Sequence, residues 1–412
     1  MDRRKDRGTE ESAGGSSIAE SMKALILTNM RVLKMQTLSA DEQRKSSPEV
    51  LLQRMLSTKS YITTDSSLAE ANQRAAEDKA QRDFISIGKG QCGTVFALKG
   101  TTEIIKISNG ANKHKELHQD AIMHKNIQDA FGRVSSSLRQ DIHVPLYQGW
   151  VTPDSTSFWD TKAALFPGDV QVPTYGLKSE RIFPLPYPVR AALVDALCPR
   201  SVKKQKEAYL QKPENKDCLV RLYLGRREET SKNENVRLRN FPLHVNEMEN
   251  LKLDTEMFAK SLARALSVLH WAAGVDANDV EFVLGSSPAT NTTGEPTLEE
   301  MEVCDIDELG KLYHYDYEHR SISVWLIDFN QCRGFEKNKD GLKQLVDGFF
   351  WNDPYYPRPG TSNKKDEKLW DIFADAYLEA SEEFGKEDGM ARAFILEVEK
   401  RAKKRSGGMF AN

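Results

Sequence analysis

The sequence predicts a mixed α+β fold with two lobes, preceded by an N-terminal helical extension and interrupted by insertions. Residues 88–95, GKGQCGTV, have a GxGxxGxV pattern between two runs rich in β-forming residues. Apolar side chains recur at helical spacing over residues 258–269, and a short acidic loop and an apolar run follow directly. A second apolar run, residues 324–327, ends on Asp328. These three stretches indicate two strand-rich regions that flank a buried helix.

Length and composition indicate a globular chain without membrane segments. Its 412 residues, 39% of them hydrophobic, are enough for two or three domains. No apolar run reaches 18 residues and residues 1–20 lack the centre of a signal peptide, so we expect a cytoplasmic protein with no membrane partner. Five scattered cysteines without CxxC spacing argue against disulfides and zinc, and we expect no metal site. The net charge of −3 predicts no DNA partner and requires local basic patches for any RNA.

The chain divides into three predicted parts. Residues 1–80 are expected to form a partly disordered helical extension, with a wholly disordered tail as the alternative. Residues 81–227 are expected to form a small β-rich lobe with an ordered insertion at 142–187 and its last strand at 218–227. Residues 240–412 are expected to form a larger, mostly helical lobe with a polar insertion at 286–320. The basic stretch 400–408 is predicted to be disordered.

The acidic loop supplies the first candidate catalytic residues. Asp254 stands at the N-cap position of the central helix, and Gly274 suits the left-handed position that ends a helix. Asp276, Asp279 and Glu281 then fall within six residues, so three carboxylates crowd one turn. A solvated polar loop is the simpler alternative, because surface turns favour Asp for its local hydrogen bonds.

Asp328, at the exit of its apolar run, is the fourth catalytic candidate, since an Asp at a strand end serves chemistry or a turn. Lys106 lies in the strand-like EIIKIS and would point at the cleft. The order of glycine loop, lysine strand and helix resembles that of a protein kinase, in which a carboxylate on the helix pairs with the lysine. Asp120 occupies the corresponding place, with Glu116 as the substitute. The alternative for Lys106 is an edge lysine that discourages strand pairing. We expect Lys106 and Asp120 to contact substrate.

The order of glycine loop, lysine strand, helix, acidic loop and Asp-Phe strand end resembles the protein-kinase fold. Asp276 and Asp328 match the catalytic-base and Asp-Phe-Gly aspartates of that pattern. Glu281 stands where a kinase has its metal-binding Asn, Asn330 replaces the Gly, and no His-Arg pair precedes Asp276. A kinase-like scaffold is therefore better supported than kinase activity.

An aromatic segment, FFWNDPYYPRP, places five aromatic residues between Phe349 and Tyr356 among Asn352, Asp353 and three prolines. A loop does not need this density merely to turn, so we expect the segment to pack against the active cleft. Asn352, Asp353 and Tyr355 are the predicted substrate contacts there.

The motifs VDANDVEFVLG, WLIDFNQC and NDPYYPRP, with FPLPYPVRAALVDALCP upstream, resemble a fungal family first labelled a domain of unknown function. Its members include arginine-containing cyclodipeptide synthases, and the similarity covers roughly residues 80 to 400. The resemblance implies a transferase or ligase of secondary metabolism that makes a cyclo-arginyl diketopiperazine. Arginyl-tRNA and a second aminoacyl-tRNA would be its substrates, and downstream tailoring enzymes its partners in the pathway. No family catalytic residue is carried over.

The predicted residues suit this chemistry. An aminoacyl ester is already activated, so joining two residues needs proximity, a base and oxyanion donors, and we expect no cofactor. Carboxylates can also bind the planar guanidinium of arginine, and Lys106 can supply positive charge near an oxyanion or phosphate. ATP and Mg²⁺ belong to one alternative, a kinase-like phosphotransferase. A pseudokinase-like interaction module is another.

Cations concentrate between Arg200 and Arg239, and this run is the candidate tRNA track. A solvated face is the alternative, as is a contact through the basic stretch 400–405. The residues assigned to tRNA are Lys203, Lys204, Lys206, Arg226 and Arg227.

Overall fold

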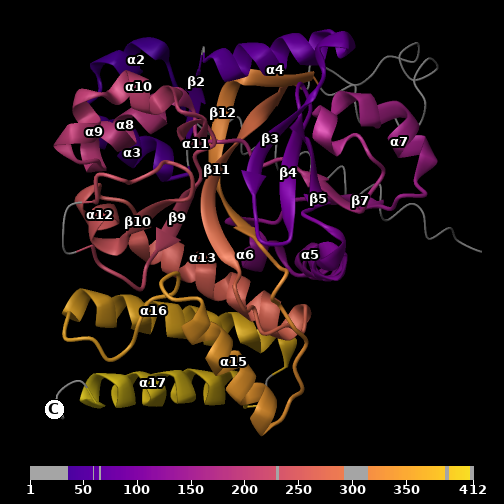
Figure 1. Ribbon diagram of the computed structural model, residues 1–412. Helices are drawn as coiled ribbons and strands as arrows, with labels where there is room; N and C mark the ends of the chain where they lie inside the picture. Colours follow the sequence, from indigo (N-terminus) through magenta and orange to yellow (C-terminus); the bar gives the residue numbers. More distant parts are fainter. Residues whose placement is uncertain are drawn as a thin grey trace, which may run out of the picture. The chain divides into compact units, whose positions relative to one another are not determined.

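The computed structural model describes residues 36–58, 60–64, 66–228, 232–291, 314–385 and 389–408 (Figure 1). Leu38–Asn412 is one compact unit. Of the preceding unit, Met1–Thr37, only the first two residues of β1 (Gln36–Leu38) are described. The predicted helices between residues 18 and 33 therefore lie outside the described residues. Within the described ranges, no helix has the length and apolarity needed to cross a bilayer.

An antiparallel five-stranded sheet contains the glycine hairpin and the lysine strand. Its order is β3 (Phe84–Lys89), β4 (Gly93–Leu98), β5 (Glu103–Ser108), β8 (Gly176–Glu180) and β7 (Tyr147–Val151). Its small apolar core includes Phe166, whose ring stacks on Phe84 with centroids 4.1 Å apart. β7 and β8 show that the expected insertion at 142–187 is wrong in part, because this segment supplies two strands of the sheet itself.

Three short helices and one long helix pack near this sheet. On the side of Phe166 lie α7 (Thr156–Lys162), η3 (Ala163–Leu165) and η4 (Gly168–Val170). The long α5 (His114–Arg133), preceded by η2 (Ala111–Lys113), contacts β7 and β8 and is followed by α6 (Ser136–Arg139). Leu117 and Ala121 of α5 pack with Cys92 and Leu177, so α5 is fixed to the glycine hairpin and to β8.

The second sheet has the order β2 (Ser60–Thr63), β12 (His314–Ile327), β11 (Glu281–Asn291), β9 (Val220–Tyr223) and β10 (Phe241–His244). β6 (Ile142–His143) also pairs with β12. β11 and β12 form a long antiparallel pair with Glu281 opposite Ile327, which brings the acidic loop beside Asp328. Two predictions are wrong here. The strand at 218–227 belongs to this sheet rather than to the small one, and the insertion at 286–320 includes the ends of two strands.

Several helices pack on the second sheet or on one another beside it. The prediction of helices before residue 80 is confirmed by α2 (Ala40–Lys45), α3 (Pro48–Leu56) and α4 (Ser67–Glu77), with η1 (Lys79–Gln81) after them. They are not a mere extension, because β2 pairs with β12, α3 packs on α8 and α4 contacts β12. The remaining helices of this group are α8 (Tyr187–Leu197), α9 (Arg200–Lys204), α10 (Lys206–Gln211), α11 (Pro213–Lys216) and α12 (Val245–Asn250).

A helical layer lies at the far end of the second sheet from α4 (Figure 1). It consists of α13 (Thr255–Ser267), the π-helical η5 (Val268–Ala272), α15 (Lys339–Trp351), α16 (Lys364–Ser381), η7 (Glu382–Phe384) and α17 (Met390–Gly408). Asp254 caps α13 by accepting from the N–H of Met257 at 2.9 Å, and Gly274 has a φ of 68°, so both predictions are confirmed. The prediction of a disordered basic tail is wrong, because α17 includes residues 400–408.

Candidate functional site

A cleft of about 430 Å³ lies between the two sheets. The glycine hairpin, β5 and α5 line one side of it, and β9, β11 and the end of β12 line the other. Four of the predicted site residues meet there, namely Lys106, Asp120, Glu281 and Asp328. Asp276, Asp279, Asn352, Asp353 and Tyr355 are not among the residues that line it.

The glycine hairpin lies directly against the lysine strand. The N–H of Gly90 donates to the carbonyl of Gly93 at 2.8 Å and closes the turn between β3 and β4. A Cβ at Gly93 would be 2.7 Å from the carbonyl O of Ile107 and 2.9 Å from Cγ of Lys106. Only glycine allows this approach without displacing β5. Gly88 and Gly90 themselves line the cleft.

Lys106 and Asp120 form the predicted ion pair. The Nζ of Lys106 donates to Oδ2 of Asp120 at 2.7 Å, and their side chains are only 16% and 6% exposed. Burial opposes the charge on Lys106, but Asp120 and Asp328 outweigh it and raise the pKa of the lysine. Lys106 is therefore a fixed cation at the base of the cleft. Glu116, the alternative partner, pairs with Lys113 instead.

Glu281 and Asp328 are two cleft carboxylates whose ionisation is shifted toward neutrality. Burial raises the pKa of Glu281 to about 7, against the opposing effect of Arg221, whose Nη2 donates to Glu281 Oε1 at 2.5 Å. Burial also raises the pKa of Asp328 to about 6, with Lys106 opposing the shift. Among the described residues, none donates a hydrogen bond to the carboxylate of Asp328. Asp328 therefore faces the cleft with its acceptor oxygens free.

Backbone conformation near this site is unusual. Asp328 has a φ of 65°, and Ala277 and Asp279 in the acidic loop have φ values of 54° and 64°. Residues other than glycine rarely adopt this region, which costs free energy and persists only where the surroundings impose it. Such positions concentrate at functional sites, and these three lie on the two segments that carry the carboxylates.

Asp276, one of the four candidate catalytic residues, does not line the cleft. Its Oδ1 accepts from the backbone N–H groups of Asn278 and Arg333 at 3.1 and 2.9 Å. Its Oδ2 accepts from Nε2 of Gln344 at 2.8 Å. A carboxylate used in this way joins the acidic loop to the segment after Asp328, so we assign Asp276 a structural role.

Asp279 and Asn352 do not line the cleft but bond to each other beneath the acidic loop's turn. Oδ2 of Asp279 accepts from Nε2 of Gln331 at 2.5 Å, and burial raises its pKa. The buried side chain of Asn352 bonds to the acidic loop through the carbonyl of Ala277 and the N–H of Asp279. Neither residue is positioned to contact a ligand in the cleft. Both fix the turn from which Glu281 emerges.

The rest of the aromatic segment also supports the site from outside. Asp353 is exposed and forms ion pairs with Arg226 at 3.8 Å and Arg358 at 3.3 Å. Tyr355 is buried, and its ring packs edge-on against Tyr223 with centroids 5.3 Å apart. None of these partners lines the cleft, so these contacts do not show the expected packing against it, and direct substrate contact by Asp353 or Tyr355 is not supported by the lining of the cleft.

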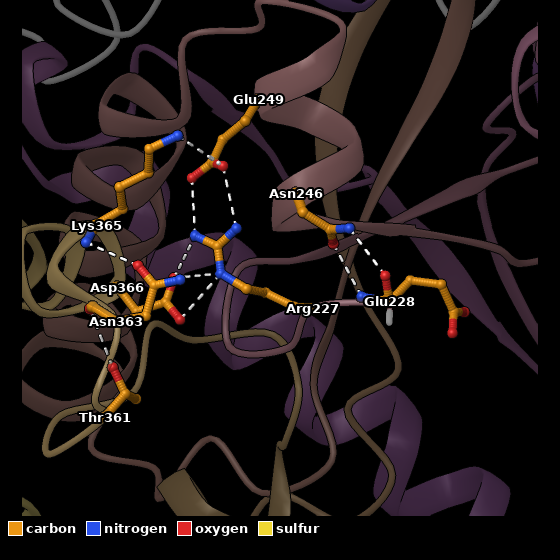
Figure 2. Close-up of polar contacts among 8 residues, drawn as sticks. All are labelled: Arg227, Glu228, Asn246, Glu249, Thr361, Asn363, Lys365 and Asp366. Carbon is orange, nitrogen blue, oxygen red and sulfur yellow. Dashed lines mark hydrogen bonds and ion pairs between the residues drawn. The ribbon is translucent and has the colours of Figure 1, made fainter. Parts of the chain in front are cut away.

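The guanidinium of Arg227, a predicted tRNA contact, forms hydrogen bonds with two carboxylates (Figure 2). Its guanidinium donates to both oxygens of Glu249 at 2.9 and 3.0 Å, and its Nη2 donates to Asp366 at 2.6 Å. These hydrogen bonds raise the pKa of Arg227 and lower that of Glu249. Arg227 thus joins the chain after β9 to α12 and α16, and a phosphate would have to displace both acids.

The other predicted tRNA contacts are dispersed. Lys203 and Lys204 are exposed on α9, whereas Lys206 pairs with Asp195 at 2.8 Å. Arg226 is 58% exposed. In Figure 1, α9 and α10 lie on the opposite side of the second sheet from β3–β5, so Lys203 and Lys204 do not adjoin the cleft.

Sequence reasoning missed several polar residues of the cleft, among them Arg221 and His124. Arg221 alternates with the buried Val220 and Leu222 along β9, and this period of two places it on the cleft face. His124 lies one turn after Asp120 on α5, and its Nε2 bonds the carbonyl of Pro145 at 2.6 Å. Burial lowers the pKa of His124, which favours its neutral form. In the sequence, Arg221 is only one cation of the run between Arg200 and Arg239.

Comparison with known families adds one partial match. A family model described as DUF3669: Zinc finger protein matches residues 324–389, which run from the end of β12 to the start of α17. A comparison with curated proteins finds no match. The matched segment contains Cys332 as its one cysteine and no histidine, and among the described residues no three His, Cys, Asp or Glu side chains are arranged to hold a metal. The residues there do not fit a structural zinc site.

Proposed function

We propose that this protein is an aminoacyl-tRNA-dependent cyclodipeptide synthase, built on a kinase-like scaffold, that makes a cyclo-arginyl diketopiperazine. The observation that carries the proposal is the free carboxylate of Asp328 in a cleft that also holds Glu281 and Lys106. Lys106 acts on this half-buried carboxylate electrostatically, but no described residue donates a hydrogen bond to it, so a cationic ligand that donates to it would stabilise its ionised form. A guanidinium or an α-ammonium group meets that need, and a guanidinium can bind in bidentate geometry.

The proposed reaction balances without a cofactor. The neutral α-amine of one aminoacyl-tRNA attacks the ester carbonyl carbon of the other, a C–N bond forms, and the C–O bond between that carbonyl carbon and its own tRNA breaks. The tRNA leaves as its 3′-terminal alcohol with the proton that the amine loses. A second attack by the free amine on the remaining ester closes the ring and releases the second tRNA. The ester supplies the driving force, so the protein contributes positioning and proton transfer.

The cleft residues divide these tasks. Glu281, with a pKa of about 7, can take a proton from an α-ammonium group, whose ordinary pKa is about 7.7–8.0. Asp328 binds the substrate cation. Lys106, fixed by Asp120, supplies positive charge toward a developing oxyanion or a phosphate. Arg221 holds Glu281 in place through a hydrogen bond and limits the rise of its pKa.

The sequence resemblance supports arginine as one substrate, arginyl-tRNA and a second aminoacyl-tRNA as carriers, and fungal secondary metabolism as the setting. Two of the motifs behind the resemblance, WLIDFNQC and NDPYYPRP, lie within the residues matched by the family model. A cytoplasmic location and downstream tailoring enzymes complete the proposal.

The experiment is expression in a heterologous host, followed by mass spectrometry of extracts for cyclo-arginyl products. In lysate, RNase should abolish product formation. Product that persists after RNase with free amino acids and ATP would exclude the tRNA mechanism. A host that expresses the Asp328→Asn variant provides the matched control, because this variant keeps the shape of the cleft and removes only the charge.

A kinase-like phosphotransferase is the second candidate, and the Lys106–Asp120 pair beneath the glycine hairpin favours it. Two observations weigh against it. Asp276 is held by backbone groups away from the cleft, and Glu281, in the place of a metal-binding Asn, is occupied by Arg221. Mg-ATP at a hundred times its dissociation constant should stabilise such an enzyme by about 2.7 kcal/mol. No thermal shift with Mg-ATP would dismiss this candidate, and absence of both shift and product would favour an interaction module.

A further inference from the structure

A row of four aromatic rings lies where α5 meets β7 and β8 of the first sheet. The ring centroids of His114 and Tyr175 are 4.5 Å apart. Tyr175 stacks in turn on Trp150, with centroids 6.0 Å apart and ring planes 29° apart, and His118 is 5.2 Å from Trp150. His114 and His118 are one turn apart on α5, so both project from the same face of this helix. These four residues are called the ring row below.

The ring row is accessible from outside. His118 is exposed, and the other three rings are half-buried. Ile122, one turn after His118 on α5, is 46% exposed and extends the apolar surface. Trp150 is fixed from behind, because it packs on a small core formed by Cys92, Leu117, Ala121 and Leu177.

The protein does not use the polar atoms of these rings. Among the described residues, none forms a hydrogen bond with Nε1 of Trp150, with the hydroxyl of Tyr175 or with either imidazole of the row, and none of these atoms is sealed from solvent. Half-buried Tyr and Trp side chains usually find a hydrogen-bonding partner. The ring row therefore combines flat apolar faces with accessible donors and acceptors, which is the combination that unpaired nucleobases bind.

The charge beside the ring row suits an anionic partner. Lys115, which follows His114 on α5, and Lys89, at the tip of the glycine hairpin, are both exposed. Within the described ranges neither lysine forms an ion pair, whereas the acidic Glu116 on the first turn of α5 is already paired with Lys113 at 2.7 Å. The positive end of the α5 dipole adds to this charge. Phosphates would pair with these lysines, whereas an apolar protein surface would leave them without a partner.

We propose that the ring row binds the single-stranded 3′ end of tRNA, with bases stacked on Trp150 and Tyr175 and phosphates directed toward Lys115 and Lys89. This inference rests on the proposed function, because it identifies the surface that delivers the aminoacyl ester to the cleft. Stacking on aromatic side chains tolerates every base, and this suits a protein that accepts two different tRNAs.

The ring row is linked to the cleft through the glycine hairpin. The carbonyl of Tyr175 accepts from the N–H of Ser108 at 3.3 Å. The next residue, Asn109, donates from Nδ2 to the carbonyl of Gly90 at 2.8 Å. Gly90 and Lys89 line the cleft. A strand that is stacked on the ring row therefore reaches the cleft over the tip of the hairpin, whereas the exposed lysines of α9 do not adjoin the cleft.

The test measures binding of a labelled RNA hairpin that copies a tRNA acceptor stem, with and without its unpaired 3′ end, to the full-length protein by fluorescence anisotropy. The natural protein should bind the tailed hairpin more tightly than the blunt one. Trp150→Leu keeps an apolar side chain on the small core but removes one stacking face. It should weaken binding of the tailed hairpin by about 5- to 150-fold, the range for one stacked base, and leave the affinity for the blunt hairpin unchanged. Trp150→Phe should keep most of the affinity.

Further variants make the assignment specific. His118→Ala should also weaken binding of the tailed hairpin, and it decides the question if Trp150→Leu does not fold, because His118 is exposed. Lys115→Ala should flatten the slope of log affinity against log salt by about 0.7. Trp351→Leu is the matched control, because Trp351 is 63% exposed at the end of α15 and has no ring contact with the row. It should bind both hairpins like the natural protein.

The outcomes separate this inference from the proposed function. Equal affinity of the natural protein for the two hairpins, or natural affinity in both Trp150→Leu and His118→Ala, would overturn the inference and leave the ring row to packing or to a protein partner. A natural protein that makes no cyclic product but binds the tailed hairpin through the row would lose the proposed function and keep the RNA site. Cyclic product together with unchanged RNA binding in the ring variants would do the reverse.

Discussion

The buried side chain of Asn352 accepts a hydrogen bond from the backbone N–H of Asp279 at 2.6 Å. Its Nδ2 donates to the carbonyl of Ala277, also at 2.6 Å, so a single amide group holds both ends of a three-residue turn. Both bonded residues have a positive φ, which they would not adopt without such support. The turn leads directly into Glu281, and its shape therefore determines where that carboxylate enters the cleft.

Asn352→Ala should lower the free energy of unfolding by about 1–3 kcal/mol, because it leaves one buried donor and one buried acceptor unpaired. It should also reduce product formation, since Glu281 loses its fixed position. Urea denaturation and mass spectrometry measure the two effects. Lys343→Ala on α15, the helix that Asn352 caps at its C-terminal end, is the control, because the ion pair of Lys343 with Asp347 is exposed and should contribute little. Equal stability of the two variants would contradict the assigned role of Asn352.

Stability should fall as the pH rises toward neutrality because of Glu281. Burial raises its folded-state pKa to about 7 from an ordinary value of 4.5, so the folded protein binds the proton more tightly than the unfolded chain. This contribution is complete below pH 4.5 and is lost as the pH rises through about 7. Asp328 acts in the same direction between its ordinary 3.8 and about 6.

Urea midpoints between pH 5 and 8 test this prediction with Glu281→Gln as the comparison. The variant cannot ionise at position 281, so its stability should fall less over this range. Product formation should show the opposite trend in the natural protein, because the base must be deprotonated to accept a proton. A parallel pH dependence of stability in both proteins would show that Glu281 does not titrate in this range.

The elements that follow local patterns were predictable. Asp254 and Gly274 bound the central helix as expected, because capping depends on a few neighbouring residues. The Lys106–Asp120 pair was predictable because the order of glycine loop, lysine strand and helix resembles that of a protein kinase, in which such a pair occurs. The placement of β9 and of residues 142–187 was not, since strand pairing depends on non-local contacts that leave little trace in a short sequence window.

The acidic loop, too, could be predicted only in part from local sequence. Its crowded carboxylates were evident, but which of them faces a ligand depends on distant groups. The carboxylate of Asp276 accepts hydrogen bonds from the backbone N–H of Arg333 and from the side chain of Gln344, whereas β11 directs Glu281 into the cleft. The partner that tunes Glu281, Arg221, comes from a strand sixty residues earlier.

Removal of the Lys106 charge should be strongly destabilising. Lys106→Met leaves Asp120 buried and unpaired, which should lower the free energy of unfolding by about 3–5 kcal/mol. Lys113→Met, which removes the more exposed pair with Glu116, should cost less than about 1 kcal/mol. The double variant Lys106→Met, Asp120→Leu should recover part of the loss, because neither charge then remains. No recovery would indicate that packing, rather than charge, accounts for the effect.

Removing the charge of Asp328 should affect product formation strongly and the stability of the fold little. Asp328→Asn should abolish the cyclic product, because the neutral amide cannot balance a substrate cation. Its melting temperature should be equal to or higher than that of the natural protein, since burial disfavours the ionised form of this carboxyl group. Asp160→Asn, an exposed change on α7, is the control for activity. Full activity of Asp328→Asn would remove the observation on which the proposed function rests.

The last prediction separates surface cations from structural ones. Replacing Lys203, Lys204 and Lys206 by Ala should weaken tRNA binding while the melting temperature stays nearly unchanged, because these side chains lie at or near the surface. Each lost phosphate contact should flatten the slope of log affinity against log salt by about 0.7, so three contacts amount to about two units.

Arg227→Ala should behave in the opposite way. It leaves Glu249 and Asp366 facing each other without their shared cation (Figure 2), so the free energy of unfolding should fall by about 2 kcal/mol or more. Its salt slope should match that of the natural protein, because a guanidinium held by two carboxylates is not available to a phosphate. A flattened slope in Arg227→Ala with unchanged stability would indicate that Arg227 does contact a tRNA phosphate. An unchanged slope in the triple lysine variant would show that α9 and α10 are a solvated face.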